Sequence, residues 1–234
     1  MAYTTIDDPS AYFNSLIYTG NVTVRALTFD GNSDLAVDWI WLKSRSISGN
    51  HHLYDSVRGT QKHLRSNLDS AEGTNGGTDG VTAFSSNGVT IGTNTASNDD
   101  GETFVGWGWK AGTSFTNDAS GTGIGTIDSA GSVNTDAGFS IISFTGTETS
   151  SQSVAHGLGA VPELIISKSR DVADNWMVHH GSFSENDYIS LNLTNAKASA
   201  SSVWSSLPTS TVINIGDNAG VNDDGAMIMY AFRS

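Results

Sequence analysis

The sequence contains no cysteine, which excludes disulfide bonds, thiolate metal sites and cysteine nucleophiles. Positive charge is also scarce, because 11 Lys and Arg stand against 24 Asp and Glu, for a formal net charge of -13. Such a chain repels the phosphate backbone of nucleic acids and the anionic surface of membranes. We therefore expect neither nucleic acid nor membrane as a partner.

Long hydrophobic runs are missing as well. No apolar stretch approaches the roughly 20 residues of a membrane-spanning helix, and the first residues, Met1 to Asp8, lack the basic head and apolar centre of a signal peptide. The sequence therefore predicts synthesis in the cytoplasm of the producing cell. Hydrophobic residues make up 37% of the chain, so its core must depend on a few large side chains.

Enzyme motifs are absent too. The sequence has no G-x-S-x-G, no H-E-x-x-H and no G-x-x-x-x-G-K-[ST] pattern. Most Asp residues lie in Asn- and Gly-rich segments typical of exposed turns, and no pattern marks the buried carboxyl pair that a glycosidase needs. We expect a protein without enzymatic activity, and a polysaccharide depolymerase is the least favoured alternative.

The chain contains an internal repeat. The block Asn-Asp-Asp-Gly occupies residues 98–101 and again 222–225, 124 positions later, and Lys-Ser-Arg occupies 43–45 and 168–170. Other matching segments recur at nearly the same offset. The repeat indicates a tandem duplication of a unit of about 100 residues, which is long enough to form its own hydrophobic core.

Apolar residues alternate with small or polar ones over short stretches, as in Val105, Trp107 and Trp109. A period of two is typical of half-buried strands, and Gly, Asn and Asp clusters between such runs favour turns. The fold class predicted is all-β, with two tandem antiparallel β-sandwich or jelly-roll lobes. Whether the lobes share a sheet stays open. The expected boundaries are an N-terminal arm at 1–12, lobe 1 at 13–110, a Gly/Ser/Thr-rich linker at 111–137 and lobe 2 at 138–234.

Four aromatic residues near the ends of the two copies are candidate ligand-binding residues. Trp107 and Trp109 in the first copy match Tyr230 and Phe232 in the second. Alternate residues of a strand share one face, so each pair forms either a core stripe or a platform for a flat ligand such as a sugar ring. A similar pair, Trp39 and Trp41, is matched by aliphatic residues in the second copy, which favours the core interpretation.

The repeated acidic block is a candidate calcium site. Asp99 and Asp100 in the first copy, and Asp223 and Asp224 in the second, place carboxylates before a glycine. The D-x-[DN]-x-[DN]-G spacing of a calcium loop is absent, however, and Asx residues before a strand are typical of a tight turn. The turn interpretation is preferred, and calcium remains the alternative.

The histidines include two adjacent pairs, His51 with His52 and His179 with His180. Neighbouring residues of a strand point to opposite faces, so such a pair seldom binds one metal ion with both rings. The repeat offset aligns His179 with Tyr54. We expect no zinc site.

Several segments resemble a known group of proteins. They are F-D-G-N-S-D-L at 29–35, D-W-I-W-L-K-S-R at 38–45, V-G-W-G-W-K-A-G at 105–112 and S-V-N-T-D-A-G-F at 132–139. They are similar to concanavalin-like or lectin-like domains in virion structural proteins of marine tailed bacteriophages, and the similarity covers nearly the whole chain. The resemblance assigns no ligand residues.

The resemblance implies a virion protein assembled in the bacterial cytoplasm, as part of a tail fibre or other exposed appendage. Its partners would be other virion proteins, further copies of itself in a homotrimer, and polysaccharide of the host surface. The alternative is a capsid decoration or head fibre with a purely structural role.

Overall fold

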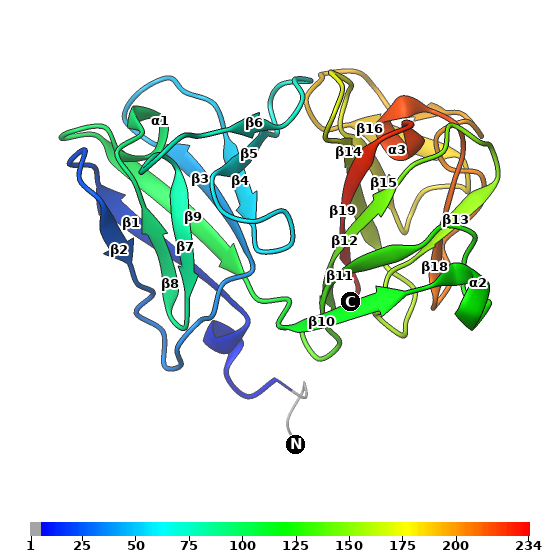
Figure 1. The fold of residues 1–234 in the computed structure, drawn as a ribbon, viewed down its shortest axis with the longest axis horizontal. Helices are drawn as coiled ribbons and strands as arrows, with labels where there is room; N and C mark the ends of the chain where they lie inside the picture. The colour runs from blue at the N-terminus through cyan, green and yellow to red at the C-terminus, as the bar shows by residue number, and fades with distance from the viewer. Residues whose placement is uncertain (1–5) are drawn as a thin grey trace. The chain divides into compact units, whose positions relative to one another are not determined.

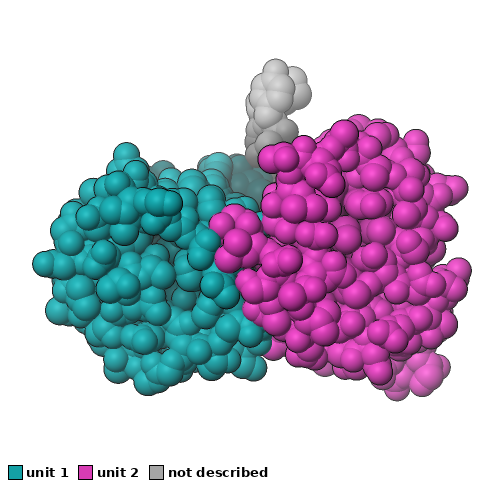
Figure 2. Space-filling view, turned by 90° about the horizontal axis from the view of Figure 1, so that it is seen from above, with its two compact units in different colours: residues 1–66, 72–112 teal, residues 67–71, 113–234 magenta. Residues whose placement is uncertain are grey.

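A computed structural model describes residues 6–234 of the protein, and it divides into two compact units. Unit 1 comprises the residues up to Ser66 together with Glu72–Gly112, and unit 2 comprises Asn67–Ala71 together with Thr113–Ser234. Figure 2 colours them separately. Nearly all of the regular structure is antiparallel β-sheet, which confirms the all-β prediction (Figure 1). In residues 6–234 no helix could span a lipid bilayer.

Unit 1 is a sandwich of two sheets. The larger has the order β1-β9-β3-β4-β5-β6 and the smaller β2-β8-β7. The elements are β1 (Phe13–Thr19), β2 (Arg25–Leu27), β3 (Trp39–Ser44), β4 (His52–Asp55), β5 (Lys62–Arg65), β6 (Gly73–Thr74), β7 (Val81–Ser85), β8 (Gly88–Ile91), α1 (Thr95–Asn98) and β9 (Thr103–Trp109).

The core of unit 1 lies between these sheets, because both contribute alternate apolar residues to one buried cluster. Its members are Tyr18, Leu27, Phe29, Leu35, Val37, Ile40, Leu42, Tyr54, Val81, Val89, Ile91 and Phe104. The tight turn between β7 and β8 needs a glycine, since Gly88 has φ +100° and a Cβ there would lie 1.9 Å from the carbonyl oxygen of Leu27.

Unit 2 repeats this plan and extends it. Its larger sheet has the order β10-β11-β12-β19-β14-β15-β16-β17, and β13 pairs with β18 in the smaller one. The elements are β10 (Thr113–Asn117), α2 (Ala119–Thr122), β11 (Ser129–Asn134), β12 (Phe139–Thr145), β13 (Gln152–Ala155), β14 (Leu164–Ser169), β15 (Met177–His180), β16 (Asp187–Ser190), β17 (Ala198–Ser199), β18 (Val212–Ile215), α3 (Ala219–Asn222) and β19 (Ala226–Phe232).

The core of unit 2 again lies between the two sheets. Ile142, Met227 and Met229 from the larger sheet share one buried cluster with Val154 and Ile213 from the smaller sheet.

The duplication is confirmed by the strand registers. In unit 1 the last strand pairs with the first, Trp109 opposite Phe13, and with the third. In unit 2 the last strand does the same, Phe232 opposite Phe139, and it also pairs with β14. Equivalent strands therefore occupy equivalent places in the two sheets.

The repeated Asn-Asp-Asp-Gly block has the same structural role in both units. Asn98 is fully buried; its Nδ2 donates to the carbonyl oxygens of Thr23 and Gly92, at 2.9 and 2.8 Å. Asn222 is equally buried, and its Nδ2 donates to those of Thr149 and Gly216, both at 2.8 Å. We call Asn98 and Asn222 the hub asparagines, because each ties the connection after the first strand to the segment before the last strand.

The segment 111–137, which the sequence predicts to be a linker, contains two strands in the structure. Residues 113–117 and 129–134 are β10 and β11, and β11 pairs with β12 along six residues, Ser129 to Asn134. The segment adds two strands to the edge of an existing sheet, so its backbone hydrogen bonds are satisfied with few apolar side chains of its own. Gly131 permits the close approach, since a Cβ there would lie 1.9 Å from the carbonyl oxygen of Ile141.

The predicted N-terminal arm at 1–12 lies partly outside the described residues. Its described end is attached to unit 1: Pro9–Ala11 form a 3₁₀ helix capped by Asp8, and the Asp8 carboxylate accepts a hydrogen bond from the Ser33 hydroxyl at 2.6 Å. These hydrogen bonds lower the pKa of the Asp8 carboxyl, with Ser10 the larger contributor and Ser33 the next. Residues 8–11 are therefore part of the lobe.

Candidate functional site

The alternation of glycine and tryptophan in β9 decides which way its aromatic residues point. Gly106 and Gly108 are buried and face the core, where a Cβ would lie 3.1 Å from Leu42 Cδ2 and 2.7 Å from Phe29 Cζ, respectively. Successive residues of a strand point to opposite faces, so Trp107 and Trp109 lie on the outer face of the sheet. Both are half-buried, and neither belongs to the core cluster of unit 1.

Neighbouring strands add further aromatic rings to this outer face. Trp41 on β3 lies opposite Trp107, with ring centroids 6.4 Å apart and planes at 82°. Trp39 lies opposite Trp109 at 4.5 Å, and Phe13 on β1 lies 4.9 Å from Trp109 on its other side. The sheet register thus gathers rings from three strands into one aromatic cluster, in which Trp39 is buried and Phe13 is 43% exposed.

A cleft of about 310 Å³ opens in this cluster, lined by Trp41, His51, Trp107 and Trp109. We call it the aromatic cleft. His51 precedes β4, and its Nδ1 accepts a hydrogen bond from the indole Nε1 of Trp41 at 2.8 Å. Burial, followed by the nearby Lys43 charge, lowers the pKa of His51. The imidazole is therefore neutral at pH 7, and because Nδ1 accepts, Nε2 carries the proton.

The geometry suits an uncharged ligand with a flat apolar face. Indole rings offer a surface on which the C–H face of a sugar ring can pack, and a neutral imidazole adds a polar edge. No carboxylate lines the cleft. The arrangement can bind a ligand, but it contains neither a nucleophile with its base nor a pair of carboxyl groups.

Of the four aromatic candidates in the sequence, the structure brings two into the cleft. Trp107 and Trp109 line it, so the preferred interpretation of these residues as a core stripe is wrong. Their equivalents behave differently: Tyr230 is fully buried, and Phe232 packs on Phe139 with ring centroids 4.7 Å apart. Unit 1 therefore presents partly exposed aromatic rings on the outer face of its sheet, whereas Tyr230, at the position equivalent to Trp107 in unit 2, is fully buried.

Two residues of the cleft were missed by the sequence analysis. Trp41 was assigned to the core because aliphatic Ile166 replaces it in the second copy, and His51 was considered only for metal binding. The glycines at 106 and 108 were the available signal, since a strand that presents glycine to the core places its large rings on the other face.

The acidic candidates form turns in the structure. Asp99 and Asp223 follow the short helices α1 and α3 as their C-cap residues, and the carbonyl oxygen of each lies close to a glycine of the first connection. Asp100 and Asp224 are exposed. In residues 6–234 no group of three or more His, Asp or Glu side chains is arranged to hold a metal ion. The geometry therefore favours the turn interpretation over calcium.

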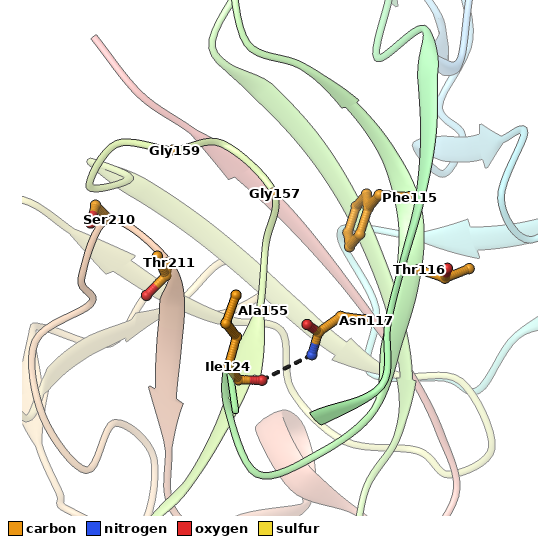
Figure 3. A pocket seen from close by; sticks show the side chains of 9 residues that line it. All are labelled: Phe115, Thr116, Asn117, Ile124, Ala155, Gly157, Gly159, Ser210 and Thr211. Carbon is orange, nitrogen blue, oxygen red and sulfur yellow. Dashed lines mark hydrogen bonds between the residues drawn. The ribbon is translucent and has the colours of Figure 1, made fainter. Parts of the chain in front are cut away.

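A second concavity of about 310 Å³ lies in unit 2, where the added segment meets the smaller sheet. Figure 3 shows Phe115 and Asn117 of β10 on one side and Ser210 and Thr211 on the other. Asn117 Nδ2 donates to the carbonyl oxygen of Ile124 at 2.9 Å, which fixes the loop at its edge. Among the residues that line this second concavity, Phe115 alone has an aromatic ring, so the concavity offers less stacking surface than the aromatic cleft.

Comparison with curated proteins and with solved structures gives no match. One family model does match, over residues 8–234, and its description is a domain of unknown function, DUF7483. This match includes both duplicated units, so the domain that the family model describes comprises the pair. The chain belongs to the DUF7483 family.

Proposed function

We propose that the protein is a non-enzymatic bacteriophage virion protein, part of a tail fibre or other exposed appendage, that binds neutral polysaccharide of the host surface in the aromatic cleft. The single observation that carries the proposal is the half-buried group Trp41, Trp107 and Trp109 around one concavity on the outer face of a sheet. Large aromatic rings that are left partly open to solvent stabilise a fold less than fully buried rings do, so ligand contact is a reason for their presence.

The charge of the protein supports a neutral ligand. With a net charge of -13, the surface repels anionic polymers, and the cleft contributes no cation except the nearby Lys43. Stacking on indole faces needs no charge, so neutral hexose polymers fit the site best.

The carboxyl groups support a role without catalysis. In the described part of the chain, side-chain hydrogen bonds from Ser10, Ser120 and Lys197 lower the pKa of the Asp8, Asp118 and Asp187 carboxyl groups, respectively. A glycosidase needs one carboxylic acid whose pKa is raised so that it holds a proton at neutral pH. Binding without cleavage is therefore proposed. The proposal also includes self-association into a trimer on the particle.

The proposal is tested by glycan-array and titration measurements with host-type polysaccharide. Trp107→Ala should weaken binding at least 10-fold, equivalent to about 1.4 kcal/mol, because it removes one wall of the cleft. Since Trp107 is half-buried, the same change should cost unit 1 only about 1–2 kcal/mol of unfolding free energy, below the 3–5 kcal/mol typical of a fully buried Trp. Trp107→Phe should recover part of the affinity.

The matched control is Phe232→Ala, which truncates the aromatic residue equivalent to Trp109 in unit 2 and should leave the affinity unchanged. Equal binding by wild type and Trp107→Ala would remove the cleft from the proposal. Absence of wild-type binding to every glycan on the array, together with tight binding to empty capsids, would instead support a capsid decoration.

A further inference from the structure

One edge of the larger sheet of unit 1 faces solvent. Its first strand, β1, pairs with β9, and within residues 6–234 no strand lies on its other side. Phe13, Ser15, Ile17 and Thr19, which alternate along β1, are exposed. Ile17 is 65% exposed, the largest exposed fraction among the big apolar side chains of the described chain, and Phe13 is 43% exposed. We call residues 13–17 the β1 edge.

The main chain of the β1 edge is arranged to accept a further strand. The hydrogen bond from the Gly20 N–H to the Glu102 carbonyl oxygen, at 2.8 Å, extends the β1–β9 ladder by one residue. Because hydrogen-bonded pairs alternate along an antiparallel ladder, the even-numbered residues of β1 bond to β9. The N–H and C=O groups of Phe13, Ser15 and Ile17 therefore point away from β9, as on an edge to which another strand can add.

Unit 2 shows what covers the equivalent edge. Its strand β12 occupies the place of β1, with Phe139 equivalent to Phe13, and β11 pairs with β12 on the side away from β19. In that pairing Ser143, the equivalent of Ile17, lies opposite Ala130. The covered edge thus has a half-buried serine where the uncovered edge has an exposed isoleucine. An apolar side chain at the more exposed of two equivalent positions favours a partner on that edge.

The strand β1 lacks the features that keep exposed strand edges apart. Its sequence, F-N-S-L-I-Y-T, contains no charged residue and no proline, and its register with β9 has no bulge. By contrast, β6 at the other edge of the sheet is only two residues long. Although the protein carries a net charge of -13, no charge within β1 opposes pairing with a second copy of itself.

The β1 edge is complementary to itself. When two copies run antiparallel with Ser15 opposite Ser15, Phe13 of one copy lies opposite Ile17 of the other, and the reverse pair forms as well. An aromatic ring opposite a β-branched side chain is a favourable cross-strand pair. This one register covers the exposed apolar side chains of both copies and pairs their outward main-chain groups. The Ser15 N–H, which donates to its neighbour Asn14 Oδ1 at 2.8 Å, would exchange that bond for one to the second copy.

We propose that the β1 edge is a self-association surface, at which the β1 strands of two copies pair antiparallel about Ser15. The pairing joins two larger sheets of unit 1 into one. Opposite residues of an antiparallel pair point to the same face, so the aromatic clefts of both copies open on the same side of the joined sheet. The contact has two-fold symmetry, so it is separate from the trimer contact of the proposed function and would turn a trimer into a hexamer.

Analytical ultracentrifugation of the purified protein tests the pairing without any glycan. The wild type should sediment as an even-numbered assembly, a dimer or a hexamer. Ile17→Lys puts a charge on the edge and should raise the dissociation constant of the two-fold contact at least about 10-fold, so that the assembly mass falls to half. The matched control is Ile47→Lys, at an isoleucine of unit 1 that is 39% exposed and lies outside β1, and it should leave the mass unchanged.

A second variant tests the main-chain pairing separately from the side chains. Ser15→Pro removes an N–H that points away from β9, a place where an edge strand tolerates proline, and it should also halve the mass. Near-UV circular dichroism equal to that of wild type would show that the variant is folded. In wild type, amide hydrogen exchange at Ile17 should slow as the protein concentration rises, because this N–H then donates to the Phe13 carbonyl oxygen of the second copy.

A wild type that stays monomeric or trimeric at every soluble concentration would overturn the inference, as would equal masses for Ile17→Lys and wild type. Either result would leave the aromatic cleft in place, since glycan binding and its loss in Trp107→Ala are measured separately. Absence of glycan binding would remove the proposed function and leave the pairing of β1 strands intact.

Discussion

Replacing one hub asparagine should destabilise one unit selectively. Asn98 is fully buried in unit 1, and its side chain makes three hydrogen bonds to main-chain groups. Its Oδ1 accepts from the N–H of Asn21 at 3.1 Å, and its Nδ2 donates to the carbonyl oxygens of Thr23 and Gly92 at 2.9 and 2.8 Å. Asn98→Ala removes all three and leaves three main-chain groups unpaired.

The magnitude follows from the burial of those groups. Gly92 is buried, so its unpaired carbonyl should cost about 1–3 kcal/mol, whereas Asn21 and Thr23 are exposed and water can replace part of their bonds, at about 0.5–1.5 kcal/mol each. Because such terms are not additive, we expect a total loss of about 2–5 kcal/mol. For a domain of this size that lowers the melting temperature by about 10–25 °C.

The assay is differential scanning calorimetry combined with amide hydrogen exchange, which assigns the loss of protection to unit 1 or unit 2. Asn222→Ala is the matched variant and should act on unit 2, while Asn21→Ala, which truncates an exposed side chain, should change the melting temperature little. Melting of Asn98→Ala within about 2 °C of wild type would refute the hub role, as would a loss of protection confined to unit 2.

Two further predictions concern protons and metal ions. Burial is the main cause that lowers the pKa of His52 to about 4, from 6.5, so the unfolded chain takes up this proton first as the pH falls. Unit 1 should therefore lose up to about 3 kcal/mol of stability between pH 6.5 and 4. Urea titrations at both pH values should show a smaller loss for His52→Phe than for wild type. Equal losses would show that His52 is not the group responsible. Because Asp99 and Asp223 cap short helices, the melting temperatures in excess chelator and in excess calcium should be the same. A higher melting temperature with calcium would instead support a bound calcium ion.

The sequence contains enough information for the fold class and the duplication, because alternation and repeated blocks are local patterns. The residues 111–137 were not recognisable as strands, since Ile127 and Val133 are among their few buried apolar side chains and β11 depends on pairing with β12. Strands that add to the edge of an existing sheet need little apolar pattern of their own.

The candidate site was predictable only in part, for a different reason. A period of two shows that Trp107 and Trp109 share a face, but it does not show which face is buried when both faces carry apolar residues. That choice depends on Phe29 and Leu42, which fill the space over Gly106 and Gly108 from elsewhere in the chain. The partner of Trp41, His51, is likewise fixed by the register of β3 and β4.

Comparison of the two units separates residues that the fold requires from residues that are free to change. The hub asparagines keep the same three types of hydrogen bond in both copies, so replacing either one would destabilise the unit that contains it. Trp41 and Tyr54, by contrast, correspond to Ile166 and His179, and the sandwich forms around either residue. Each unit has thus changed at a different place on the same scaffold, unit 1 on the outer face of its sheet and unit 2 at one end of its sandwich.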